Sequence, residues 1–230
     1  MNKQQGEEGL QEVYFLRFLL VLLLVIMHSF NMFTGSPSWP LPDGIQPILA
    51  YDWISKTAYS FMLETFVFIS GYIFSYQLYG QNKDICLKGL IRGKLQRLVL
   101  PCIIFGLLYL LCFERESFDN IPKMLYSIIS GVGHLWFLPM LFWCFIFSYF
   151  LAKMKEPNLG ILYVLFGLSI FSFLPLPFQM SNSLFFMFYF YLGMYCWKKR
   201  EQMMRLSYKN GVLVGLWGGV SSDIRLSDID

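Results

Sequence analysis

Residues 13–33 read VYFLRFLLVLLLVIMHSFNMF, and this stretch decides the class of fold. It is an apolar run of the length that an α-helix needs to cross the hydrocarbon core of a bilayer, about 20 residues. Because lipid offers no hydrogen bonds, an open chain in the membrane has to satisfy its backbone internally, as a helix does. The run therefore predicts a transmembrane helix that contains Arg17 and His28.

The composition of the whole chain agrees with a membrane protein. Of its residues, 56% are hydrophobic, 19% are aromatic and 14% are charged, whereas a soluble domain carries about 25% charged residues. Further apolar runs follow the first, and loops that contain proline separate several of them. We predict an all-α fold, a polytopic transmembrane helix bundle with about six spans at residues 13–33, 60–79, 95–113, 135–153, 159–176 and 184–197.

The two ends of the chain differ from the apolar centre. Residues 211–220 are apolar but too few to cross about 30 Å of hydrocarbon at about 1.5 Å per residue. We expect residues 1–210 to form the membrane domain, and residues 211–230 an interrupted seventh helix with a polar tail, as in a truncated or frameshifted chain. The alternative is a short re-entrant or interfacial end. The leader before the first span carries three acidic residues, which is not typical of a cleavable signal peptide.

The distribution of lysine and arginine predicts the orientation of the bundle. Twelve of these residues lie in the loops on one side of the predicted spans, and three lie in the alternate loops. Because basic residues concentrate in cytoplasmic loops, this bias predicts a cytoplasmic N-terminus. Pro101 lies inside the third span, where it should kink the helix or mark its true start.

Arg17 and His28 are eleven residues apart on the first span. Eleven residues are about three helical turns, so the two side chains share one face and lie about 16 Å apart along the axis. Ionisable residues within a span usually face a cavity or a partner. Taken alone, Arg17 is also compatible with a side chain that reaches to the interface, and His28 with a packing role.

Glu64 lies about one turn inside the outer start of the second span, at a depth similar to that of His28. A carboxylate that accepts a hydrogen bond from one imidazole nitrogen would set the tautomer and raise the basicity of the other nitrogen. The sequence thus makes His28 and Glu64 the candidate catalytic pair. The alternative is a Glu64 side chain that faces water at the outer loop.

Lys94 and Arg97 form a K-x-x-R pair at the cytoplasmic start of the third span. Residues three apart lie on one helix face, where such a pair can bind phosphates, although a positively charged flank of a span has the same appearance. His134 and Trp136 open the fourth span on the outer side and suit a sugar face, although Trp136 could equally be an aromatic anchor at the interface.

Ser70 and Gly71 are small residues in the second span, for which we expect a packing role. The five cysteines form no CxxC pair and the chain has two histidines. This inventory predicts no metal site.

Five motifs in this order resemble the acyltransferase 3 family of integral membrane O-acyltransferases. They are LRFLLVLLLVIMHSF with its R-x10-H spacing, FVFISGY, KLQRLVLP with its R/K-x-x-R element, HLWFLPML and FFMFYFYLGMY. They extend over most of the chain, from about Leu16 to Arg200. The HLWFL form is closest to the branch that is similar to fucose acetylase and to the enterobacterial-antigen acetylase. Family members typically have about ten spans.

The resemblance implies an activity, partners and a location. The implied reaction moves an acyl group, with acetyl as the expected group, from cytoplasmic acyl-CoA to a hydroxyl of an extracytoplasmic carbohydrate or lipid-linked glycan. It implies that His28 acts at the acceptor hydroxyl and that Arg17, Lys94 and Arg97 hold the donor. Acyl-CoA, expected to be acetyl-CoA, is then a co-substrate, nucleic acid is not a partner, and the location is a bacterial cytoplasmic (inner) membrane.

Two other functions compete with this interpretation. A transporter or flippase for a lipid-linked sugar would be expected to show paired halves and broken helices, and no repeated half is visible in the sequence. A truncated, non-catalytic membrane partner is favoured by the abrupt polar tail. Loss of donor binding in a chain that still inserts stably into the membrane would indicate the second of these functions.

Overall fold

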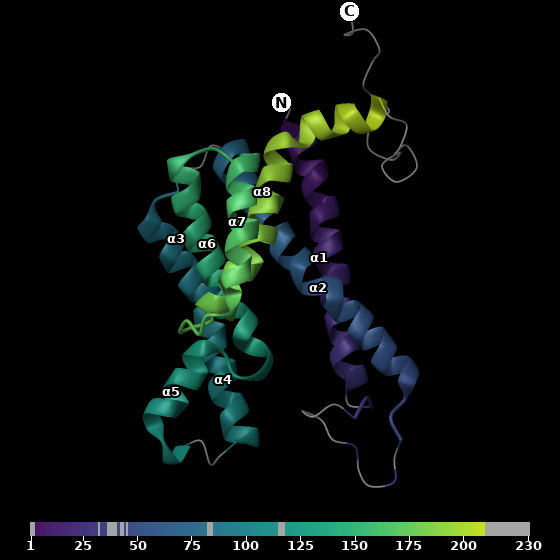
Figure 1. The fold of residues 1–230 in the computed structure, drawn as a ribbon, viewed down its shortest axis with the longest axis vertical. Helices are drawn as coiled ribbons and strands as arrows, with labels where there is room; N and C mark the ends of the chain where they lie inside the picture. The colour runs from purple at the N-terminus through teal and green to yellow at the C-terminus, as the bar shows by residue number, and fades with distance from the viewer. Residues whose placement is uncertain are drawn as a thin grey trace, which may run out of the picture.

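The computed structural model describes residues 3–31, 33–35, 41, 44, 46–81, 85–114 and 118–209. These residues form helices joined by turns and irregular segments, with no strand among them (Figure 1). The all-α prediction is therefore confirmed. The predicted seventh helix at residues 211–220 lies outside the described residues. The α-helices are α1 (Lys3–Asn31), α2 (Leu49–Ser75), α3 (Leu87–Lys94), α4 (Leu100–Phe113), α5 (Ile121–Ser130), α6 (Phe137–Met154), α7 (Leu159–Ser169) and α8 (Met180–Lys209).

Four stretches of the described chain are long and apolar enough to cross a membrane. They are Val13–Phe30, Leu49–Gly80, Leu87–Phe113 and Gly133–Met154, and they match the first four predicted spans. The fifth predicted span is a shorter apolar helix, Leu159–Phe173. The sixth lies within α8, which rises beside α7 and then bends away from the bundle (Figure 1). The chain is thus a helical membrane protein.

Two wide π-helical turns lengthen the spans at one end of the bundle. The turn η1 (Tyr76–Gly80) continues α2, and η2 (Leu95–Val99) joins α3 to α4. Pro101 lies in the first turn of α4, a position where the missing N–H leaves no helical hydrogen bond unmade. The expectation that Pro101 marks the start of a helix is confirmed, and the wider turn η2 carries the helical run across it.

Helix α2 begins at Leu49, well before the predicted start at residue 60. Asp52 and Lys56 lie four residues apart in this added segment, and the Lys56 Nζ lies 2.8 Å from the Asp52 carboxylate. Such pairs support an exposed helical turn by a few tenths of a kcal/mol, about 0.2–0.5. Helix α5 was not predicted at all. Its N-cap is Asn120, whose side chain accepts a hydrogen bond from the Lys123 amide.

The tightest helix pair in the bundle is α2 with α8. A Cβ atom added at Gly71 would lie 1.9 Å from the Phe190 carbonyl oxygen, and one added at Gly193 would lie 2.0 Å from the Phe68 carbonyl oxygen. The two glycines therefore let each backbone approach the other directly. The buried Ser75 hydroxyl donates to the Met194 carbonyl at 3.2 Å across the same pair. This geometry confirms the packing role expected for Gly71.

Two groups of buried side chains hold the helices together. The larger group joins α2, α6, α7 and α8 and includes Phe74, Met140, Phe190 and Tyr191. The smaller group joins α1 to α2 through Leu20, Met27, Ala58, Met62 and Ile69. From Val13 to Phe30, the other side chains of α1 are exposed or half-buried, as expected for a helix that presents one face to its neighbour and the others to lipid.

Candidate active site

His28 lies in the last turns of α1, and its ring has a defined partner. The Nδ1 atom lies 2.9 Å from the Leu24 carbonyl oxygen, one helical turn earlier. Because a carbonyl oxygen only accepts hydrogen bonds, Nδ1 carries the proton, and the Nε2 atom of the neutral ring keeps its lone pair. His28 is half-buried and borders a shallow recess of about 390 Å³ lined by Leu24, Val25 and Ser29. The arrangement leaves Nε2 as the nitrogen that can take a proton.

His134 packs directly against His28. The two ring centroids are 4.2 Å apart and the ring planes meet at 77°, an edge-to-face arrangement. His134 belongs to a short 3₁₀ turn, η4 (Gly133–Trp136), which leads into α6. The structure therefore brings together two of the predicted site residues that are 106 positions apart in the sequence.

The turn that carries His134 is held in place by close backbone packing at Gly131 and by the Trp136 ring. Gly131 has φ +87°, and a Cβ atom at this position would lie 2.5 Å from the backbone nitrogen of Trp136. Only glycine fits such a conformation and such a close approach. The Trp136 ring packs against Phe137 and Phe186, with centroids 6.3 Å and 6.0 Å away. Trp136 therefore anchors η4 to the larger buried group.

Glu64 does not make the hydrogen bond to His28 that the sequence suggested. Its Oε2 atom is buried and has no hydrogen-bond partner among the described residues, while the His28 Nδ1 atom is bonded to Leu24. The Leu24 carbonyl belongs to α1 itself, one helical turn before His28, so no residue of a second helix is needed to set the tautomer of His28. Glu64 lies within electrostatic range of Tyr59 and Tyr189. A catalytic role for Glu64 stays a prediction.

The sequence assigned three cations to the donor: Arg17, at the other end of the same face of α1, and Lys94 and Arg97, in α3 and η2. The Lys94 Nζ lies 3.3 Å above the centre of the Phe145 ring. Lys94 also interacts electrostatically with both Arg97 and Arg17. Within the described part of the chain, none of the three forms an ion pair with a carboxylate. Like charges that gather without counter-ions repel one another, so this cluster favours a bound anion.

A surface recess on α3 and η2 is lined by residues other than these three cations. The recess, of about 630 Å³, is lined by Lys88, Arg92, Gln96 and the apolar residues between them. Lys94 is half-buried and Arg97 is exposed on the same helical run. The cationic end and the His28 end are separated by about 16 Å along α1. Among the described residues, no group of three His, Cys, Asp or Glu side chains could hold a metal ion.

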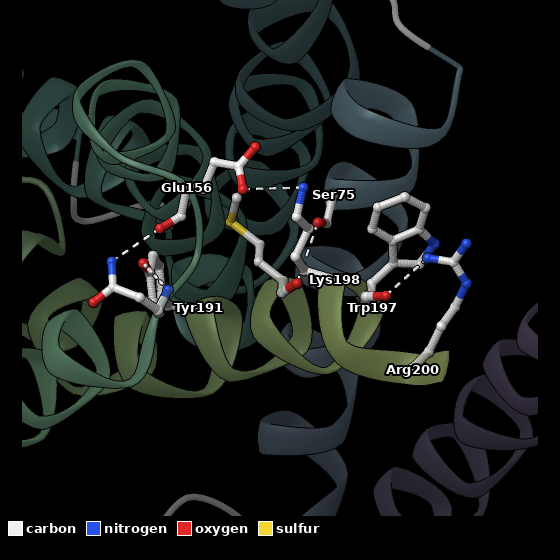
Figure 2. Close-up of polar contacts among 8 residues, drawn as sticks. Ser75, Glu156, Tyr191, Trp197, Lys198 and Arg200 are labelled. Atoms are coloured by element: carbon white, nitrogen blue, oxygen red, sulfur yellow. Dashed lines mark hydrogen bonds and ion pairs between the residues drawn. The ribbon is translucent and has the colours of Figure 1, made fainter. Parts of the chain in front are cut away.

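A second polar cluster, which the sequence did not indicate, joins α8 to the α6–α7 loop and to the end of α2 (Figure 2), and it also contacts η1. The Lys198 Nζ lies 3.1 Å from the Glu156 carboxylate and 5.0 Å from the Tyr79 ring centre. Tyr79 stacks on Trp197, and the Arg200 guanidinium lies 4.1 Å from the Trp197 ring centre on α8. These contacts connect helix ends, so we assign them to the scaffold. Only the basic residues of this cluster were visible in the sequence, as part of the charge bias.

Comparison with known proteins assigns the chain to a family. The family model described as an acyltransferase domain, that of the acyltransferase 3 family, matches residues 11–222, nearly the whole chain. Neither the curated proteins nor the solved structures give a significant match. The chain belongs to the acyltransferase 3 family, which confirms the family indicated by the motifs. Family and fold together make it a membrane acyltransferase.

Proposed function

We propose that this acyltransferase moves an acyl group, expected to be acetyl, from acyl-CoA on the cytoplasmic side to a hydroxyl of an extracytoplasmic carbohydrate. Acyl-CoA acts as a co-substrate, and no cofactor is bound permanently. The acceptor class follows the branch that is similar to fucose acetylase and to the enterobacterial-antigen acetylase. The proposed location is the cytoplasmic (inner) membrane, with the N-terminus in the cytoplasm.

The observation that carries the proposal is the cluster of Arg17, Lys94 and Arg97. Coenzyme A carries several phosphate charges, and arginine and lysine side chains are the usual ligands of phosphates in proteins. Lys94 interacts electrostatically with both arginines. In the described residues no carboxylate pairs with any of the three. An anionic donor would supply the missing counter-charge.

His28 is the general base of the proposed reaction, and it lies at the opposite end of the α1 face that carries Arg17. In the proposed reaction the acceptor hydroxyl oxygen attacks the thioester carbon, and the His28 Nε2 atom takes the hydroxyl proton as a general base. The carbon–sulfur bond then breaks, and the proton passes from His28 to the leaving thiolate. The Nδ1 contact with Leu24 at 2.9 Å supports this role, because it keeps the lone pair on Nε2. The separation of about 16 Å between Arg17 and His28 suits the long, thin pantetheine arm.

The test measures donor binding by the purified chain in lipid nanodiscs. Acetyl-CoA is titrated against the unmodified protein, Arg97→Ala and Arg17→Ala, and acetyl-pantetheine, which lacks the nucleotide phosphates, is titrated in parallel. Loss of one charge-assisted contact is worth about 1.5–3 kcal/mol, so each variant should bind acetyl-CoA roughly 10- to 100-fold more weakly. Acetyl-pantetheine should bind weakly to all three proteins.

Lys155→Ala is the matched control, because Lys155 is an exposed basic residue on the same predicted side and outside the cluster. It should leave acetyl-CoA binding unchanged. If the unmodified, folded chain does not bind acetyl-CoA, or if acetyl-pantetheine binds as tightly as acetyl-CoA, the proposed donor site is wrong.

A further inference from the structure

We infer that His134 is a positioning residue for His28: its ring, packed edge-to-face against the His28 ring, holds Nε2 in the direction in which it can act as a base. This inference rests on the proposed function for its catalytic meaning. The ring geometry itself can be tested independently of any activity.

A hydrogen bond at one nitrogen does not by itself immobilise an imidazole ring. The terminal torsion of histidine is broad and roughly two-fold, so a ring held only at Nδ1 can rock, or turn over when the bond breaks. The His134 ring removes this freedom. Its centroid lies 4.2 Å from that of His28, closer than the usual range of about 4.5–7 Å for aromatic pairs. Rotation of the His28 ring would therefore bring it into collision with His134.

His134 can limit rotation of the His28 ring because the backbone that carries His134 is itself held in place. The backbone of Gly131 lies against that of Trp136, closer than a side chain at position 131 would allow. Trp136 in turn packs against Phe186 of α8. The short turn that presents His134 is thus tied to the packed part of the bundle, whereas His28 belongs to α1, which is packed on one side only.

A different role for His134 would be a direct hydrogen bond to the acceptor, since its side chain is exposed. The two roles differ in what the ring has to supply. A positioning residue needs only its shape and its aromatic character, while an acceptor ligand needs its nitrogen atoms. His134→Phe keeps the ring and removes the nitrogens, and His134→Ala removes both.

The first measurement is nuclear magnetic resonance of the chain labelled with ¹⁵N and ¹³C in histidine, in nanodiscs. The protein has two histidines, so the rings give two separable signals. In the unmodified protein and in His134→Phe, His28 should show a protonated Nδ1 and an unprotonated Nε2. In His134→Ala, the His28 ring signals should shift and broaden as tautomers and ring orientations exchange. Unchanged His28 signals in His134→Ala would overturn the inference.

The second measurement is steady-state transfer with varied donor and acceptor. Misplacing a catalytic group by about 1 Å can reduce the rate up to about 100-fold, so kcat should fall by about 10- to 100-fold in His134→Ala with both KM values unchanged. His134→Phe should restore most of kcat. If His134→Phe is as impaired as His134→Ala and the acceptor KM rises, His134 binds the acceptor and the inference fails.

Lys123→Ala, an exposed substitution on α5, is the control and should leave both measurements unchanged. If the unmodified chain transfers no acyl group, the proposed function fails. The His28 signals in the two His134 variants then still decide whether His134 positions the ring.

Discussion

Two sets of helices in the bundle are packed very differently. Buried residues make up 44% of an apolar 18-residue window in α2 with η1, and 44% of such a window in η4 with α6, but only 11% in α1 and 17% in α3 with α4. The densely packed set, α2, α6 and α8, contains the close contacts of Gly71 and Gly193. The sparsely packed set, α1 and the α3–α4 run, carries Arg17, His28 and the K-x-x-R pair.

The residues that stabilise the fold therefore lie mainly in the densely packed helices, and the residues assigned to catalysis and donor binding lie mainly in the sparsely packed ones. Lipid is as apolar as leucine, so helices in a membrane associate through close packing and buried hydrogen bonds rather than through hydrophobic burial. The α2–α8 pair has both kinds of contact. The side chains of α1 make fewer contacts with other helices, and Arg17 and His28 are only partly covered by the protein. Stability and function should therefore respond to different substitutions.

The largest effect is expected at His28. Loss of a general base typically costs about 10²–10⁴ in rate, so His28→Ala should reduce kcat by that factor. Its free energy of unfolding should fall by no more than about 0.5–1.5 kcal/mol, because the half-buried ring loses its hydrogen bond to Leu24 and its contact with His134. Thiol release from acetyl-CoA measures the first quantity and denaturant unfolding in detergent measures the second. A large loss of stability with little loss of rate would contradict this assignment, because His28 would then support the fold rather than the reaction.

The next largest effect is expected at Gly71, in the densely packed set of helices. Gly71→Ala places a methyl group 1.9 Å from the Phe190 carbonyl oxygen unless α2 and α8 separate. Overpacking of this kind costs about 1–3 kcal/mol, and the unfolding midpoint in detergent should fall accordingly. Gly167→Ala on α7 is the control, because no atom lies within 4 Å of the added Cβ. Equal midpoints for the two variants would contradict the close α2–α8 contact.

Lys94 belongs to the sparsely packed set of helices and contacts Phe145 of the densely packed set, so one variant tests the properties of both. Lys94→Met keeps a side chain of similar length over Phe145 and removes the charge that lies near Arg97 and Arg17. Loss of the charge should weaken acetyl-CoA binding about tenfold, as for a charge-assisted contact. Stability should change by less than about 1 kcal/mol, because the lost cation–π attraction is offset by relief of burial and repulsion. A clear drop in stability with full binding would make Lys94 a core residue.

The smallest effect is expected at the ion pair of Lys198 with Glu156. The Lys198 side chain is 31% exposed and that of Glu156 is 69% exposed, and exposed pairs contribute about 0.2–1 kcal/mol. Lys198→Ala should lower stability by an amount in this range at low salt and by less at high salt. Unfolding curves at two salt concentrations measure the difference, with Lys155→Ala as the control. A larger, salt-independent loss would show that the cluster in Figure 2 is part of the packed core.

The helices and the candidate residues could be predicted where the signal is local. Long apolar runs identified the first four spans, and an eleven-residue spacing placed Arg17 and His28 on one face of α1. Helix α5 escaped prediction because its ten residues are too few for a span, and because its apolar residues lie on one face rather than all round. The early start of α2 also escaped, because Asp52 and Lys56 interrupt the apolar run.

The environment of each candidate side chain was less predictable than its position in the chain. The shared depth of His28 and Glu64 suggested a hydrogen bond, but the Leu24 carbonyl already occupies the His28 Nδ1 atom. The contact of His28 with His134 depends on a turn built around Gly131, whose conformation is not encoded by hydropathy. The electrostatic interaction of Lys94 with Arg17 likewise joins residues on separate helices that are 77 positions apart in the sequence.

The sequence by itself determined that this chain is a helical membrane protein, where its main spans lie and that it belongs to the acyltransferase 3 family. These properties follow from apolar runs and short motifs, each of which is a local pattern along the chain. Only the tertiary structure decided that His134 packs on His28, that Gly71 and Gly193 bring α2 and α8 together, and that Arg17 interacts electrostatically with Lys94. Such contacts join residues far apart in the sequence, and they depend on the placement and rotation of whole helices, which packing between helices sets.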